Sequence, residues 1–399
     1  MDKKSILIFG VGELQKSIIM RAKNMGLYVI GIDPCMDAVC KHEVDVFEIV
    51  DGQDYEGTLH IARKYNIKAV VTAATDKPLV MMARIAKELG LRFYSEETAK
   101  WSTDKFQMKE RFLKYGIPCA HGRVIKHASE ASDLEFPLIL KPRDNSGSRG
   151  VILCQDILAL EQAMEETFQH TRLNTVLVEE FIEGLEYSIE SLHYNGKCEV
   201  IQFTEKRTTP FPYNVELSHI QPANITEDQK NEICSLINKI GEALHYENCP
   251  SHTELKINST GIYIIETSPR LGGDYITSTL TPLSTGINIE DQLLHIALGE
   301  DVDCNPKCSY YSGIRFFAFN KNSVVKATPN KEVVLSWPHV VDYSLKLSKN
   351  DYVNLITSSL NRYGHIILQT ESRESMDEAL DNYEKIITKL CLVSPLEKT

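Results

Sequence analysis

Residues 254–270 read ELKINSTGIYIIETSPR, the pattern of two strands joined by a tight turn. Apolar residues alternate on both sides of the polar turn from Asn258 to Gly261, and a Gly-containing cluster between such runs predicts a hairpin. Glu254 and Glu266 flank this turn at comparable distances and are an even number of residues apart. The two glutamates therefore share a face if the loop contains no odd bulge.

Two carboxylates on one face repel each other, so a cation is expected to compensate them. Magnesium prefers carboxylate oxygens and keeps its other coordination positions for water and phosphate, and phosphoryl transfer uses such a clamp. A solvated edge hairpin with two surface glutamates explains the same residues equally well. Segments upstream are needed to choose between these interpretations.

A lysine followed by a Gly/Ser loop is the second feature. A short apolar strand begins at Phe136 and ends at Lys141, and residues 143–150 then read RDNSGSRG. Small residues let backbone N–H groups approach a phosphate closely, and Lys141 adds a point charge. The loop is not a Walker A motif, and taken alone it also suits an ordinary hairpin.

Two more segments are compatible with a nucleotide. Residues 175–182, TVLVEEFI, predict a strand whose edge can read an adenine base, with Glu186 as an acceptor for ribose hydroxyls. A plain strand-turn-strand unit is the alternative. Asp104 caps a helix whose first turn holds Lys105, where a cation opposes the helix dipole unless a polyphosphate binds. A solvated surface lysine is the simpler explanation.

In this order the segments resemble the ATP-grasp superfamily of carboxylate-amine ligases, over about three hundred residues from the amino terminus. Residues 254–256, ELK, and 270–274, RLGGD, are most similar to the L-amino acid ligases, in the branch that includes biotin carboxylase and carbamoyl phosphate synthetase. The resemblance implies an α/β chain of ATP-grasp architecture. Its expected parts are a doubly wound parallel domain (1–100), an ATP-grasp domain (101–300, with a small lid subdomain at about 118–190) and a carboxyl-terminal α+β domain (301–399).

The resemblance also implies cofactors and binding residues. The cofactors are ATP and magnesium, with manganese as a substitute. The residues assigned to ATP are Lys105, Lys141, Ser146, Gly147, Ser148, Arg149, Gly150, Glu179, Glu180, Phe181, Ile182 and Glu186. Glu254 and Glu266 would carry the metal. The family has Asn two residues after the second glutamate, whereas this chain has Ser268, a weaker candidate ligand with one oxygen.

The reaction implied joins an amino acid or other small carboxylic acid to an amine, or to a thiol, through an acyl phosphate with release of ADP. Arg270 is the candidate to stabilise the oxyanion of the second step, and an ion pair with Glu254 or Glu266 is its structural alternative. Substrate candidates are Glu216, His219, His252, Gly273 and Asp274. His219 or His252 could act as the general base, although histidines are more often hydrogen-bonded polar residues without a catalytic role.

The amino-terminal residues allow a different interpretation. A strand over residues 5–9, the turn Gly10-Val11-Gly12, a helix and a second strand ending at Asp33 predict a doubly wound unit. The same residues suggest an NAD-dependent dehydrogenase, but Gln15 occupies the third glycine position. Residues 75–78, TDKP, either face the acceptor substrate or cap a helix. A non-catalytic ATP sensor is the remaining alternative, which Ser268 keeps open.

Composition and charge restrict the class of protein and its possible partners. With 399 residues, 43% hydrophobic and 25% charged, the chain can form two to three packed domains. A net charge of -12 without Lys/Arg-aromatic runs argues against a nucleic-acid partner. We expect a cytoplasmic protein without a membrane partner, because no leader and no apolar run of about 18 residues occurs. The 10 cysteines lack C-x-x-C spacing, which indicates reduced thiols, and a homodimer is compatible with this composition.

Overall fold

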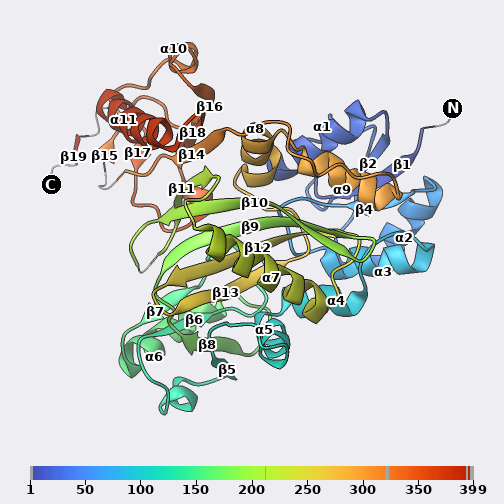
Figure 1. The fold of residues 1–399 in the computed structure, drawn as a ribbon, viewed down its shortest axis with the longest axis horizontal. Coiled ribbons are helices and arrows are strands. Elements are labelled where there is room, and N and C mark those ends of the chain that lie inside the picture. Colours follow the sequence, from blue (N-terminus) through green and yellow to red (C-terminus); the bar gives the residue numbers. More distant parts are fainter. Residues whose placement is uncertain (1–2, 212, 320–322, 392–393, 396–399) are drawn as a thin grey trace.

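The computed structural model describes residues 3–211, 213–319, 323–391 and 394–395. A long central sheet crosses the molecule, with the amino-terminal unit at one end and the carboxyl-terminal elements at the other (Figure 1). The last four residues of the predicted carboxyl-terminal domain, 396–399, lie outside the described residues. Within the described ranges, no helix combines the length and apolarity needed to cross a membrane.

The amino-terminal unit is a parallel sheet covered by helices. Its strand order is β3-β2-β1-β4, and all three pairings are parallel. Its elements are β1 (Ser5–Phe9), β2 (Tyr28–Asp33), β3 (Val46–Ile49), β4 (Ala69–Val71), α1 (Lys16–Asn24), α2 (Tyr55–Lys64) and α3 (Leu79–Leu89). β1 and β4 are buried almost throughout, as expected for parallel strands with helices on both faces. The predicted α/β class with a parallel amino-terminal unit is therefore confirmed.

The turn after β1 is filled by the protein itself. Gln15 Nε2 donates to the Ala73 carbonyl at 2.6 Å, and its Oε1 accepts from the Gly12 N–H at 3.2 Å. The Asp33 carboxylate accepts from the Val11 N–H at 2.9 Å. A dinucleotide would need the space that the Gln15 side chain fills and the carboxylate of Asp33. Both side chains are instead hydrogen-bonded within the protein, which argues against the dehydrogenase alternative.

A second sheet forms the lid, defined here as residues 118–180, up to the end of β8; the predicted range 118–190 also includes the start of β9, which belongs to the central sheet. Its strand order is β5-β8-β6-β7, with antiparallel pairings. Its elements are β5 (Gly122–Ile125), β6 (Leu138–Lys141), β7 (Ile152–Cys154), α6 (Ile157–Phe168) and β8 (Val176–Glu180). Leu140, Leu160 and Val178 belong to a hydrophobic cluster made only by this region. The lid therefore has a core of its own.

The central sheet is antiparallel, in the order β13-β12-β9-β10-β11-β14-β18-β16. Its strands are β9 (Leu185–Tyr194), β10 (Lys197–Thr208), β11 (Glu216–Gln221), β12 (Cys249–Asn258), β13 (Gly261–Ser268), β14 (Tyr311–Phe316), β16 (Val340–Leu345) and β18 (Gly364–Thr370). Strands on both sides of residue 300 are hydrogen-bonded in this one sheet. The carboxyl-terminal strands β14, β18 and β16 thus extend the central sheet.

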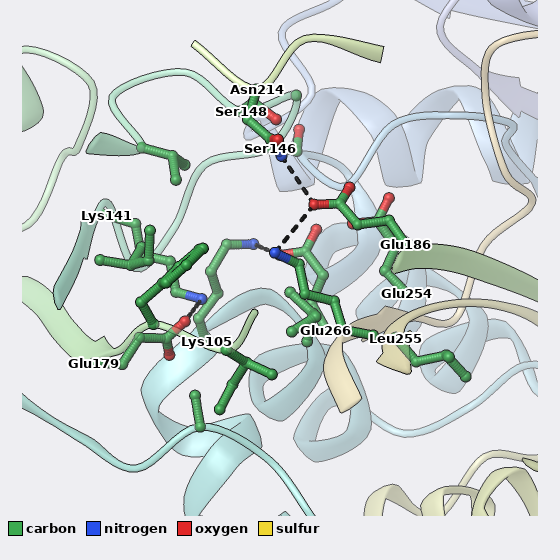
Figure 2. Close-up of a pocket in the computed structure, with 18 of the residues that line it drawn as sticks. Lys105, Lys141, Ser146, Ser148, Glu179, Glu186, Asn214, Glu254, Leu255 and Glu266 are labelled. Atoms are coloured by element: carbon green, nitrogen blue, oxygen red, sulfur yellow. Dashed lines mark hydrogen bonds and ion pairs between the residues drawn. The ribbon is translucent and has the colours of Figure 1, made fainter. Parts of the chain in front are cut away.

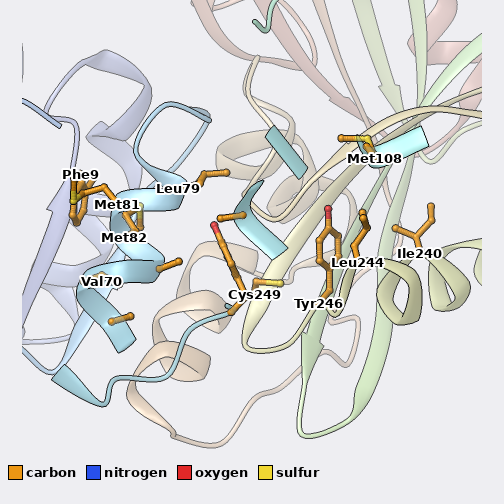
Figure 3. Packing of buried hydrophobic residues seen from close by; sticks show 14 of the residues in the cluster. Phe9, Val70, Leu79, Met81, Met82, Met108, Ile240, Leu244, Tyr246 and Cys249 are labelled. Carbon is orange, nitrogen blue, oxygen red and sulfur yellow. The ribbon is translucent and has the colours of Figure 1, made fainter. Parts of the chain in front are cut away.

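The remaining elements surround these sheets. They are α4 (Glu96–Thr103), α5 (Lys105–Lys114), α7 (Glu227–Leu244), α8 (Thr281–Thr285), α9 (Ile289–Leu298), α10 (Lys331–Leu335), α11 (Arg373–Cys391), β15 (Ser323–Val324), β17 (Tyr352–Val353) and β19 (Ser394–Pro395). Figure 3 shows that Phe9 and Met82 of the amino-terminal unit belong to the same buried cluster as Leu244 of α7 and Cys249 of β12. This shared core fixes the loops of the amino-terminal unit against the central sheet.

Candidate active site

The β12–β13 hairpin places Glu254 and Glu266 directly opposite each other. The turn pairs Asn258 with Gly261, and a regular ladder from that turn would place Ile265, not Glu266, opposite Glu254. The register shifts between Glu254 and Leu255, so Ile265 is an extra residue on β13. The expectation that an unbulged hairpin brings the glutamates together was wrong, because the bulge is what turns Glu266 onto the face of Glu254.

These glutamates lie in the cavity drawn in Figure 2, here called the first cavity. It is bordered by the lid, the start of α5 and the central sheet. Among its lining residues are Lys105, Lys141, Ser146, Gly147, Ser148, Arg149, Glu179, Glu180, Phe181, Ile182, Glu186, Glu254 and Glu266. The residues predicted for ATP are thus brought together, with the exception of Gly150. Gly150 has φ +72° and packs against His170, where a Cβ atom would come within 2.9 Å of the ring.

One side of the first cavity carries a buried cluster of lysines on Glu179. Lys141 forms an ion pair with one Glu179 oxygen, and Lys109 lies 3.1 Å from the other. Burial, together with Lys109 and Lys105, lowers the pKa of Lys141 to about 8, although Glu179 opposes this shift. Two ammonium groups share a single carboxylate, so positive charge remains for an anion such as phosphate.

The start of α5 is fixed to the lid. Asp104 caps the helix by accepting from the N–H groups of Phe106 and Gln107, as predicted. Its carboxylate also pairs with Arg143, which follows β6. The N–H of Lys105 donates to the Arg143 carbonyl at 3.0 Å. Lys105 is therefore held at the edge of the Gly/Ser loop, close to where a bound phosphate would lie.

Two aromatic rings line another part of the first cavity. The Phe181 and Phe211 rings meet edge to face at 5.3 Å, and the Lys256 ammonium lies 5.0 Å from the Phe181 ring centre. Glu186 accepts from Asn214 at 3.0 Å and lies 3.3 Å from Lys256 Nζ. An aromatic slot beside a carboxylate suits a purine base and its ribose.

Each central glutamate is paired with a lysine. Lys105 forms an ion pair with Glu266, and Lys206 Nζ lies 2.6 Å from Glu254 Oε1. Burial works against the charge of Glu254, but Lys206 and His252 outweigh it and hold the pKa of this carboxyl well below its usual range. Glu254 is therefore a carboxylate.

The donor set fits magnesium. Glu254 and Glu266 supply hard oxygens on one face, and the adjoining cavity leaves room for phosphate and water ligands. No group of three or more His, Cys, Asp or Glu side chains suited to a metal occurs among the described residues. A cation here would thus take its remaining ligands from the nucleotide and from solvent, which is how magnesium usually binds.

Arg270 and Ser268 both face Asp76, which belongs to the loop between β4 and α3. Arg270 Nε and Nη2 lie 2.9 and 3.2 Å from the two Asp76 oxygens, and Ser268 Oγ donates to Oδ1 at 2.6 Å. Burial raises the pKa of the Asp76 carboxyl, but Arg270 and Ser268 outweigh it and lower the pKa to about 2. The structural alternative for Arg270, a pair with Glu254 or Glu266, is not what the structure shows. The Ser268 hydroxyl hydrogen is directed at Asp76 rather than toward the two glutamates.

A second cavity adjoins the first and shares Lys206, Glu254 and Glu266 with it. All parts of the chain contribute to its lining, namely Glu13, Thr75 and Lys77 (amino-terminal unit), Glu216, His219, His252, Arg270, Gly273 and Asp274 (central region), and Phe316, Arg362 and His365 (carboxyl-terminal strands). The five residues predicted for substrate thus lie together. Lys206, which lines both cavities, lies within β10.

The two histidines of the second cavity differ in charge. His252 Nδ1 lies 2.5 Å from Glu190, which outweighs the effect of burial and raises the pKa of His252 to about 9. An imidazolium cannot accept a proton, so His252 does not suit the predicted role of base. Burial lowers the pKa of His219 although Asp274, 3.4 Å away, opposes it, and its buried Nδ1 has no hydrogen-bond partner among the described residues. His219 is the histidine that fits a base.

Comparison with known proteins agrees with this arrangement. The family model described as "ATP-grasp domain" matches residues 134–278, which include the lid strands β6, β7 and β8 and the β12–β13 hairpin. This part of the chain is therefore similar to an ATP-grasp domain. The predicted resemblance to this superfamily is confirmed.

Similar proteins match more of the chain. An uncharacterized protein, y4rH, of Sinorhizobium fredii is 23% identical over 94% of this chain and 80% of its own length. Alanine–anticapsin ligase of Bacillus amyloliquefaciens is 25% identical over 63% of this chain, which spans only 59% of that ligase. The crystal structure of L-amino acid ligase from Bacillus licheniformis has a TM-score of 0.84, with 19% identity and complete coverage of both chains. At this identity the likeness shows the fold.

Some residues of the ATP-grasp site were missed by sequence reasoning. Lys109 follows Lys105 at helical spacing and so lies on the same face, a signal that was available. Arg362 reaches the site only through contacts between residues far apart in the chain, whereas Asp76 lies in the segment 75–78 that was expected to face the substrate or cap a helix. Arg362 Nη1 lies 2.8 Å from Asp274 and its guanidinium stacks at 3.6 Å on Phe316, which no local pattern indicates.

Proposed function

We propose that this protein is an ATP-dependent carboxylate-amine ligase that forms an acyl phosphate and releases ADP and phosphate. The observation that carries the proposal is the position of Glu254 and Glu266. They lie opposite each other on two neighbouring strands and line both cavities at their junction. The first cavity suits a nucleotide, and the second is lined by polar residues that could bind other substrates. Chemistry between a terminal phosphate and a second substrate requires such a junction.

Each part of the first cavity has a role in this proposal. Lys105 and Lys141 bind the phosphates, the loop at residues 146–149 covers them, and the Phe181 slot with Glu186 holds the nucleoside. Glu254 and Glu266 hold magnesium, or manganese in its place, which when bound neutralises charge on the transferring phosphoryl group. Small-molecule substrates are expected, with no nucleic-acid or membrane partner and a cytoplasmic location.

The proposed reaction has two steps. A carboxylate oxygen attacks the γ-phosphorus, the bond from that phosphorus to the β–γ bridging oxygen breaks, and ADP leaves. An amine nitrogen then attacks the acyl carbon, and phosphate departs as the carbon–oxygen bond breaks. Arg270 would stabilise the oxyanion of this step, while His219 would accept the amine proton. An amino acid, or a small carboxylic acid joined to an amine-bearing metabolite, is the proposed substrate class.

A turnover screen tests this function. ADP, AMP and phosphate are measured with magnesium and ATP over pairs of amino acids and other carboxylate and amine compounds. ADP release that requires both substrates supports the proposal, whereas AMP release or no turnover with any pair contradicts it. The Glu266→Gln variant should keep its circular dichroism spectrum and lose ADP release, and unchanged turnover in this variant would remove the metal assignment. ATP binding without turnover in the native protein would instead indicate a sensor.

A further inference from the structure

Lys206 occupies an unusual position between the two cavities. It lies on β10, opposite Glu186 on β9 and His219 on β11, and its side chain is only 4% exposed. Its ammonium reaches Glu254 on β12 at 2.6 Å and lies 3.6 Å from Glu216 on β11. It lines both cavities, at the junction where the proposed transfer would take place.

The charges at this junction are balanced before any ligand binds. Lys206 pairs with Glu254 and Lys105 pairs with Glu266, so two ammonium groups neutralise the two carboxylates. A divalent cation placed between the same oxygens would add two positive charges next to them. An ammonium and a metal ion that share one carboxylate repel each other, so cation binding at Glu254 must weaken its contact with Lys206.

Burial limits where the released ammonium can go. The side chain of Lys206 has almost no exposure, so the ammonium cannot move out into solvent. Glu216 is its other ion-pair partner among the described residues, and the open space that the ammonium faces is the junction of the two cavities. In the proposed function that junction receives the terminal phosphate of ATP, an anion that would satisfy the ammonium.

We propose that Lys206 is an internal counterion that competes with the divalent cation for Glu254 and, once displaced, binds the phosphoryl group that is transferred. This inference rests on the nucleotide and metal placement in the proposed function. It assigns Lys206 a catalytic role in addition to that of Lys105 and Lys141. It also predicts that removal of Lys206 strengthens metal binding while it weakens phosphoryl binding, a combination that loss of structure would not produce.

The first test measures Mn2+ binding by titration calorimetry without nucleotide. In the Lys206→Met variant the Mn2+ dissociation constant should be about tenfold lower than in the native protein, the scale of effect that neighbours of metal ligands commonly have. An equal or higher constant in a folded variant overturns the inference. Lys206→Gln replaces it if the methionine variant does not fold, and Lys206→Arg, which keeps the charge, should bind Mn2+ as the native protein does.

The second test compares a non-hydrolysable ATP analogue with ADP, both in the presence of Mn2+. Lys206→Met should bind the triphosphate analogue about tenfold more weakly and bind ADP unchanged, because only the analogue carries the terminal phosphate. Equal effects on both nucleotides, or none, overturn the phosphoryl role. Arg207→Met is the matched control, since Arg207 is the next residue on β10, is 44% exposed and pairs with Asp377. It should change neither constant.

These binding tests separate the inference from the proposed function. If the native protein releases no ADP with any substrate pair but Lys206→Met binds Mn2+ more tightly, ligation is refuted and the counterion role stands. If the native protein turns over but Mn2+ binding does not respond to Lys206, the counterion role is refuted alone.

Discussion

The contact between Asp76 and Arg270 yields a prediction whose size follows from the structure. Asp76 belongs to the amino-terminal unit and forms an ion pair with Arg270, which follows β13. The nitrogen–oxygen distances are 2.9 and 3.2 Å. The Asp76→Asn variant keeps the shape of the side chain and removes its charge. Arg270 would then be buried without a counterion, so both the stability of this junction and the position of Arg270 should suffer.

The pKa of the Asp76 carboxyl gives the magnitude. It falls from 3.8 to about 2, and each factor of ten in proton affinity corresponds to about 1.4 kcal/mol. The charged form of Asp76 therefore contributes about 2 kcal/mol to the free energy of unfolding at pH 7. Because the pKa is lower in the folded protein, this contribution is complete above pH 3.8 and is lost as the pH falls toward about 2.

A double-mutant cycle in urea measures the contact. Asp76→Asn, Arg270→Gln and the double variant are unfolded at pH 7, and the interaction energy should be about 2 kcal/mol. Additive effects, with an interaction energy below about 0.5 kcal/mol, would refute the reasoning. In the turnover assay, Asp76→Asn should lower kcat by about 10- to 100-fold through misplacement of Arg270 and leave the KM for ATP unchanged.

Three further predictions concern other parts of the chain. Because the pKa of Lys141 lies at about 8, the affinity for ATP without metal should fall as the pH rises through that value. In the Lys141→Met variant the ATP dissociation constant, measured by fluorescence titration, should not change over the same pH range. Glu186→Gln should raise the ATP dissociation constant about tenfold, since a charged hydrogen bond contributes about 1.5 kcal/mol, and an unchanged constant would exclude Glu186 from the nucleotide site. Gln15→Gly should lower the melting temperature without creating affinity for NAD, and an NAD-dependent signal would revive the dehydrogenase alternative.

Local patterns predicted the elements well and the contacts between distant elements poorly. The hairpin, the capped helix at Asp104 and the parallel amino-terminal unit follow from turn residues, capping and apolar runs, which act over a few residues. The pairing of Arg270 with Asp76 joins positions 194 residues apart, so no local signal contains it. The same limit explains why residues 301–399 were expected as a carboxyl-terminal domain without the pairing of β14 with β11 in the central sheet.

The candidate site shows the same division. Residue types and order were enough to bring the predicted ATP-binding residues to one cavity, apart from Gly150. The protonation of His252 was not foreseeable, because it depends on Glu190, a neighbour across the sheet. The substrate candidates all belong to the central region, and the other two regions of the chain complete the lining of the second cavity around them.

The extra residue at position 265 means that the distance in sequence between the two acidic positions is the sum of two independent quantities, the length of the turn and the local slip of the strand. A relative with a longer turn and no slip could keep the same geometry under a different count, so residue spacing alone is a poor guide when such hairpins are aligned. The converse also holds. If the same sequence paired without the slip, Ile265 would lie opposite Glu254 and Glu266 would turn toward the opposite face, which would leave a protein that holds a nucleotide without using it.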